Sequence, residues 1–407
     1  MGMKQKRGKR ILVLLLLVFL AAQGFFNPFG LVSPLLSKAL FFAFSIIAIL
    51  FVFRKKTICA YPKWSYRCLM MGIFVASIMA MVFHAQSYMV SLVAILPYFL
   101  GYSYFYVVEK SKPSVAFIEK AFKILTICSL LMYIVNLVSF PNMIFGETKD
   151  EYDMSRGFVR IRIPMIEIVV TYFFYSINQW IVTKQRKNIY WILLTAVMIF
   201  MSLTRQVIAL SAILGLLFVM QTASWFKKIS VIAICIFVVY VVLPQIPMVK
   251  TMIELSEQQS LDNKSDEDIR VKAWRFYTTE FQTNAITPYL GNGVPSYGKS
   301  RWGNFVEQTT ALYQDGGNAC FTVDVGWAGF FWYFGGVATL GLLLMFWKGI
   351  TRKKATDKQY ISYALAFIAI TAIASGPILF YSQICSLSLL FYLAYAKENS
   401  SAHPQLQ

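Results

Sequence analysis

The sequence predicts an all-α polytopic membrane protein with about twelve transmembrane helices and one large external loop. Hydrophobic residues make up 58% of the 407 residues and charged residues only 14%, whereas a soluble domain carries about 25% charge. Long apolar stretches recur along the chain, and we expect each to be helical because lipid offers backbone groups no partner outside their own segment. This composition excludes a disordered chain, and six cysteines exclude a disulfide scaffold.

Twelve apolar stretches are the candidate spans, and several are shorter than the roughly 20 residues that cross the hydrocarbon core. They divide the chain into a bundle of about nine helices over 1–246, an external loop over 247–324, and three further helices with a tail over 325–407. The predicted spans are 11–27, 34–53, 68–84, 88–108, 121–140, 164–183, 189–204, 206–223, 229–246, 325–347, 360–375 and 377–396.

The basic residues predict the orientation of these spans, because cytoplasmic segments of membrane proteins collect Lys and Arg. If the N-terminus is cytoplasmic, the inner segments contain 25 of the 38 Lys and Arg but only four of the 19 acids. Topology therefore explains the net charge of +19, and a nucleic-acid partner is not needed. We expect a multi-pass protein with both termini cytoplasmic, and an uncleaved first helix rather than a signal peptide.

The external loops are the expected place for chemistry, because no inner loop is long enough to fold as a domain. Loop 141–163 contains Arg156, Arg160 and Arg162, and the last two alternate with apolar residues as on an extended segment with one charged face.

The longer loop, 247–324, contains a second basic group. Over 268–281, aromatic residues interleave with Arg270 and Arg275, which predicts a helix, and Gly291-Asn292-Gly293 then breaks the chain.

Metal and nucleotide chemistry find little support in the sequence. The chain has two His and no Cys/His cluster with ligand spacing, so we expect no metal and no cofactor. Gly293 to Ser300 matches the phosphate-loop pattern, but it follows no strand and lies in an external loop, so we interpret the match as chance. Ion-coupled transporters usually carry ionisable residues near the membrane midplane, whereas Lys38, Glu167 and Arg205 lie near external ends of spans.

Arg205 is the residue that most favours an external site. It follows Ser202-Leu203-Thr204 in a very short turn between two spans, on the side of the membrane where bases are rare. One interpretation is a boundary Arg that reaches the lipid headgroups. The other is capture of a phosphate, for which the guanidinium is suited. For Arg270 and the other external arginines the alternative is pairing with nearby acids.

Two stretches resemble the O-antigen polymerase and ligase family of bacterial surface polysaccharide assembly. One is Ser202-Leu-Thr-Arg205 with the helix that follows. The other is Arg270-Val-Lys-Ala-Trp274, followed by Ile286-Thr-Pro-Tyr-Leu-Gly291-Asn-Gly293. Asp324-Val-Gly326, with Phe334-Gly-Gly336 beyond it, is similar to the return of this family into the membrane.

The resemblance implies a metal-independent glycosyltransferase of the C-type fold in the bacterial plasma membrane. Its donor would be an oligosaccharide linked to undecaprenyl diphosphate, its acceptor another lipid-linked unit, and its surroundings the bilayer, with a chain-length regulator as a further partner. In this interpretation Arg205 and Arg270 stabilise the leaving diphosphate, and Asp324 orients or deprotonates the acceptor hydroxyl. Arg160 and Arg275 would bind substrate, and Gly291 and Gly293 would let a glycan approach the backbone closely.

Two alternatives remain open at the level of sequence. A ligase of the same family usually carries a His in the large loop, and none occurs between 247 and 324. A lipid-linked oligosaccharide flippase would leave the large external loop unexplained. Asp324 also has a structural alternative, as the N-cap of the span that begins at 325.

Overall fold

The computed structural model describes residues 13–23, 34–53, 62–142, 144–145, 152–153, 160–222, 245, 250, 269–312 and 321–396. The first helix is Val13–Ala22. The other long helices are α2 (Pro34–Phe53), α3 (Lys63–His84), α4 (Tyr88–Ser111), α5 (Val115–Ser139), α6 (Ile166–Thr183), α7 (Arg186–Met201), α8 (Arg205–Thr222), α14 (Gly326–Thr351), α15 (Tyr360–Thr371) and α16 (Tyr381–Tyr395).

The structure confirms the helical class. Each predicted span except 229–246 contains a helix in the described residues, and α2 has the predicted bounds, 34–53. Five described helices are long and apolar enough to cross a membrane: α2 over Leu36–Phe53, α3, α4, α5 and α14. Arg156 and the predicted span 229–246, apart from residue 245, lie outside the described residues.

The long helices pack as one bundle around an apolar core. α14 runs along α3, α4 packs against α16, and α6 lies between α5 and α7. One end of the bundle carries a partly buried polar contact in which the Lys358 ammonium lies 2.6 Å from the Glu119 carboxylate. The Tyr360 hydroxyl donates to the same carboxylate oxygen at 3.0 Å, which ties the α14–α15 connection to α5.

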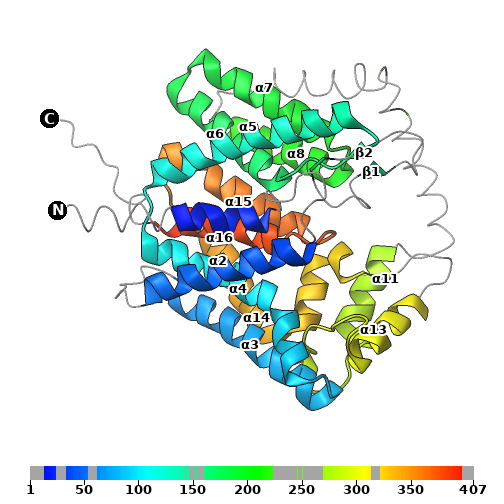
Figure 1. Ribbon diagram of the computed structural model, residues 1–407. Helices are drawn as coiled ribbons and strands as arrows, with labels where there is room; N and C mark the ends of the chain where they lie inside the picture. The colour runs from blue at the N-terminus through cyan, green and yellow to red at the C-terminus, as the bar shows by residue number, and fades with distance from the viewer. Residues whose placement is uncertain are drawn as a thin grey trace.

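The loops predicted to be external add small elements at the opposite end of the bundle. These are α11 (Ile269–Arg275), a π-helical turn (Phe276–Glu280), α12 (Thr287–Leu290) and α13 (Arg301–Leu312). Strands β1 (Tyr152–Asp153) and β2 (Arg160–Ile161) form an antiparallel pair. Figure 1 shows α11, α13 and this pair at one end of the helical bundle.

A break in α14 holds the large loop onto the bundle. Gly335 has φ 76° and ψ 175°, so the helical hydrogen-bond ladder stops there. The carbonyls of Trp332 and Tyr333 instead accept hydrogen bonds from the backbone N–H groups of Asn292 and Gly293, at 2.9 and 3.0 Å. Non-helical backbone is tolerated at membrane depth only where protein satisfies it, and here the external loop supplies the donors.

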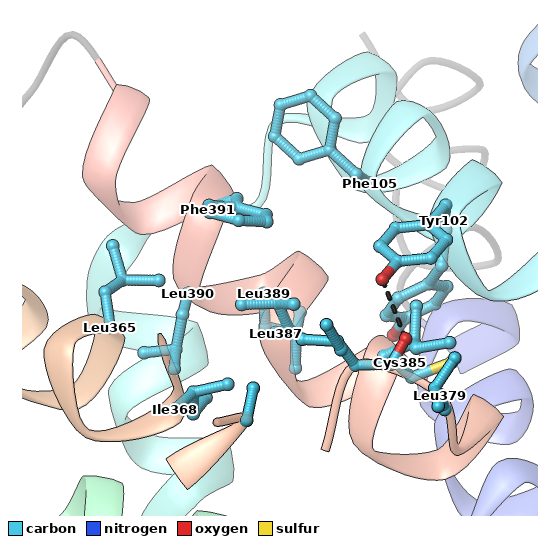
Figure 2. Close-up of a cluster of buried hydrophobic side chains, with 14 of the residues drawn as sticks. Tyr102, Phe105, Leu365, Ile368, Leu379, Cys385, Leu387, Leu389, Leu390 and Phe391 are labelled. Atoms are coloured by element: carbon cyan, nitrogen blue, oxygen red, sulfur yellow. Dashed lines mark hydrogen bonds between the residues drawn. The ribbon is translucent and has the colours of Figure 1, made fainter. Parts of the chain in front are cut away.

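The 371–380 bend consists of Thr371, the last residue of α15, and the connection that leads to α16. The Tyr102 hydroxyl of α4 donates to the Ile378 carbonyl of the bend at 2.9 Å. Figure 2 shows Tyr102 beside Leu379 and Cys385, within the apolar cluster that α16 forms with α4 and α15. The bend is therefore packed against the apolar core of the bundle.

Candidate functional site

The 371–380 bend is the point at which the elements carrying Arg205, Arg270 and Asp324 meet. Its backbone carbonyl groups accept hydrogen bonds from three neighbouring elements, α8, α11 and the start of α14.

The first contact comes from the start of α8. Only three residues separate α7 from α8, and Leu203 between them has φ 50°. Arg205 is the first residue of α8, as the short turn in the sequence predicts. Beside it, the amide of Gln206 donates to the Thr371 carbonyl at 2.9 Å, which fixes the start of α8 against the bend.

The second contact comes from α11. Ala273 and Tyr277 are buried, so one face of this segment packs on the bundle. The indole N–H of Trp274 donates to the Ile373 carbonyl at 2.8 Å. Arg270 lies four residues earlier, on the same side of the helix as Trp274. Arg270 is exposed.

The third contact comes from the start of α14. Asp324 ends a 3-10 turn, Thr322–Asp324, and the N-cap of α14 is Val325, with no side-chain cap. The first free N–H groups of the helix are satisfied by the bend: Gly326 donates to the Ser375 carbonyl at 3.1 Å and Trp327 to the Ala372 carbonyl at 3.0 Å. Because backbone carbonyls of the bend accept these hydrogen bonds, the Asp324 carboxyl is not needed as an N-cap.

The charges of Arg270 and Asp324 act on one another at this site. Desolvation by the surrounding protein raises the pKa of the Asp324 carboxyl, and the positive charge of Arg270 opposes that rise. A raised pKa makes the carboxylate a stronger base. Asp324 is nevertheless exposed at the surface, so a substrate can reach it.

A chain of hydrogen-bonded hydroxyl groups begins at Thr322, in the same 3-10 turn as Asp324. The hydroxyls of Thr322 and Tyr333 lie 2.8 Å apart, and Tyr333 also hydrogen-bonds with Tyr297. Desolvation of its hydroxyl and the neighbouring Tyr333 phenol raise the pKa of Tyr297, although the residue is 48% exposed. The chain connects the turn that carries Asp324 to the loop after Gly293 and holds the two together.

Not every predicted site residue lies at the bend. Arg275 is exposed and lies about 140° around α11 from Arg270, since each residue of an α-helix turns by about 100°. Arg160 is the first residue of β2. In the strand and just after it, Ile161 and Ile163 are buried and Arg162 is exposed, so the predicted alternation is confirmed for these three residues. Substrate binding by Arg160 and Arg275 stays a prediction.

Gly291 and Gly293 are buried against transmembrane helices. A Cβ on Gly291 would collide with the Tyr333 carbonyl, and one on Gly293 would lie 2.5 Å from the Cβ of Ala80. Both residues have positive φ, 85° and 77°. The close approach that they allow is to α14 and α3, and contact with a glycan stays a prediction.

The bend itself is the part of the site that the sequence analysis missed. Thr371 is buried, and its hydroxyl has no hydrogen-bond partner among the described residues. The available signal was Ser375-Gly376-Pro377, which interrupts an apolar stretch between two predicted spans. Glycine is also required there sterically, because a Cβ on Gly376 would lie 2.9 Å from the Val323 carbonyl.

Comparisons with known proteins do not add to this geometry. No protein-family model matches the chain, and no curated protein matches it. Within the described part of the chain, no group of three or more His, Cys, Asp or Glu side chains is arranged to hold a metal ion.

Proposed function

We propose that the protein polymerises the repeat units of a bacterial surface polysaccharide at the outer face of the plasma membrane. It transfers a glycan from undecaprenyl diphosphate to a hydroxyl of a second lipid-linked unit. The observation that carries the proposal is the shared attachment of three elements to the 371–380 bend, since these elements bear Arg205, Arg270 and Asp324. Two cations and a carboxylate at the outer end of a helical bundle suit a reaction that releases a diphosphate.

The reaction breaks one bond and forms another. The acceptor oxygen bonds to the anomeric carbon of the donor, while the bond from that carbon to the diphosphate breaks and the diphosphate leaves with the electron pair. Arg205 and Arg270 stabilise the negative charge that develops on the leaving group. Asp324 takes the proton of the acceptor hydroxyl, and its raised pKa favours this role.

Arg270 has two effects in this mechanism. Its charge holds the pKa of Asp324 below the value that burial alone would give, so the carboxyl is ionised over a wider pH range. The same guanidinium can turn to the diphosphate, because the residue is exposed. When Arg270 turns to the diphosphate, its charge no longer lowers the pKa of Asp324, so Asp324 becomes a stronger base as the leaving group departs.

The proposal includes a membrane topology. We propose about twelve transmembrane helices in an arrangement like that of C-type glycosyltransferases, with both termini cytoplasmic. Lys299 is exposed at the end that carries the large loop, and Lys353 is exposed at the other end. A single Cys at 299 should react with an impermeant reagent in intact spheroplasts, and a single Cys at 353 should not. The reverse labelling pattern would overturn the orientation.

Replacement of Arg205 tests the proposed reaction in cells. Arg205→Lys keeps the charge but loses the bidentate fork, so polymer chains should shorten sharply, and Arg205→Ala should leave single repeat units. Arg186→Ala is the matched control, because Arg186 is an exposed arginine at the inner end of α7. Polymer of wild-type length from Arg205→Ala, at normal protein level, would refute the role of Arg205.

A further inference from the structure

An apolar groove opens between α6, α7 and α8. Its volume is about 380 Å³, within the ~300–1,000 Å³ range of small-molecule sites. The lining includes Phe173, Ile177 and Trp180 from α6 and Ala212, Leu216 and Val219 from α8, and α7 adds two isoleucines. None of the lining side chains is charged, so the groove suits a hydrocarbon chain.

The groove lies on the same face of α8 as Arg205. Arg205, Ala209, Ala212, Leu216 and Val219 are spaced by four, three, four and three residues, which aligns them along one side of an α-helix. Ala209 and Ala212 are exposed, so two small residues separate the arginine from the body of the groove. A ligand held at Arg205 can therefore lie along α8 without a large side chain in its path.

The distances match a ligand that has a charged head and a long apolar tail. A helix rises about 1.5 Å per residue, so Ala212 lies about 10 Å and Val219 about 21 Å below Arg205. Both depths fall within a hydrocarbon core about 30 Å thick. Gly215 allows α8 to approach α6 closely here, since a Cβ would lie 3.1 Å from the Phe173 ring.

We propose that this groove holds the polyprenyl tail of the diphosphate-linked donor, with the diphosphate at Arg205. The proposal rests on the proposed function, and it adds a binding site for the lipid part of the substrate. Continuity with Arg205 is the reason to prefer a polyprenyl diphosphate over bulk phospholipid, because a diphosphate offers a guanidinium more negative charge and more acceptor oxygens than the single phosphodiester of a phospholipid.

Photolabelling tests the groove without any need for turnover. The probe is undecaprenyl diphosphate with a diazirine on an isoprene unit about 10–20 Å from the diphosphate, the depth of the groove below Arg205, added to purified protein in phosphatidylethanolamine nanodiscs. Labelled peptides should come from 173–180 and 212–219. In Ala212→Trp the indole displaces about two methylene groups of tail, so labelling there should fall about tenfold.

The matched control is Ile213→Trp. Ile213 is the next residue on α8 and is 55% exposed, but it does not line the groove, so labelling should stay at the wild-type level. Arg205→Ala should also lower groove labelling by the diphosphate probe, while labelling by a photoreactive phosphatidylethanolamine should not depend on Arg205.

The outcomes separate this proposal from the proposed function. Wild-type labelling in Ala212→Trp, or groove labelling that is unaffected by Arg205→Ala, would overturn the polyprenyl assignment and indicate an ordinary lipid contact. Labelling as expected in a protein that forms no glycosidic bonds would support the groove and count against the polymerase.

Discussion

Gly335→Ala is expected to detach the large loop from the bundle. Gly335 has φ 76° and ψ 175°, a region that is essentially restricted to glycine and costs other residues about 1–3 kcal/mol. The new Cβ would also collide with the Gly291 amide nitrogen and the Tyr289 carbonyl. If the collision breaks the two hydrogen bonds from Asn292 and Gly293 to α14, a further ~1–3 kcal/mol is lost at ~0.5–1.5 kcal/mol each.

The expected destabilisation is therefore about 2–6 kcal/mol. It can be measured as the change in unfolding midpoint of the purified protein in detergent, together with protease cleavage in 284–300. Gly336→Ala is the matched control, because the Cβ of residue 336 would meet only the Pro288 carbonyl at 3.3 Å and a ring carbon at 3.8 Å. Equal stability and equal cleavage of the two variants would refute the idea that the break at Gly335 docks the loop.

Three further predictions concern charge and hydrogen bonding. Arg270→Gln removes the charge that lowers the pKa of Asp324, so the acid limb of the pH–rate profile should move to higher pH, and an unmoved limb would contradict the coupling. Trp274→Phe deletes the hydrogen bond to the Ile373 carbonyl, which should cost only about 0.5 kcal/mol of stability because the bond is exposed. It should also move the acid limb to higher pH, because this bond holds α11, and with it Arg270, against the bend. A loss of rate with an unmoved limb would count against a positioning role for Trp274. Lys358→Met leaves Glu119 buried with Tyr360 as its remaining donor among the described residues. The change should cost about 3 kcal/mol, the lower end for a broken buried pair, and Glu119→Gln in the same chain should restore most of it. Thermal unfolding of the single and double variants measures this, and additive losses would show that the pair is not coupled.

The sequence predicts the local features of this fold well. Hydrophobic length and charge gave the bounds of α2, the short turn before Arg205, and the helix within 268–281, because each depends on neighbouring residues. The helix in the first predicted span, 11–27, is described over Val13–Ala22. Glycine at 291 and 293 was expected to break the chain, and α12 does end at Leu290.

The long-range contacts could not be predicted in the same way. The break at Gly335 depends on a loop more than 40 residues earlier in the chain, and glycine alone does not indicate a break in an apolar helix. Asp324 before a span reads as an N-cap, yet the carbonyls of the 371–380 bend satisfy the helix instead. The site therefore becomes visible only when the bend is placed among α8, α11 and α14.

The π-helical turn Phe276–Glu280 was likewise not foreseen. It follows α11 directly, and Phe276, Tyr277 and Phe281 are all buried there. Trp332 of α14 donates its indole N–H to the Phe281 carbonyl at 2.7 Å. A partner from α14 thus fixes the end of a segment that the local sequence predicts only as helix.

Reconstitution with a defined substrate tests the central claim most directly. The purified protein would be placed in liposomes with one synthetic repeat unit linked to undecaprenyl diphosphate, in the presence of a chelator of divalent metals. The account predicts glycans of two or more repeat units, with one undecaprenyl diphosphate released for each new linkage, and loss of both products in Asp324→Asn. Substrate that crosses the bilayer without any new glycosidic bond, or unchanged polymer from Asp324→Asn, would contradict it.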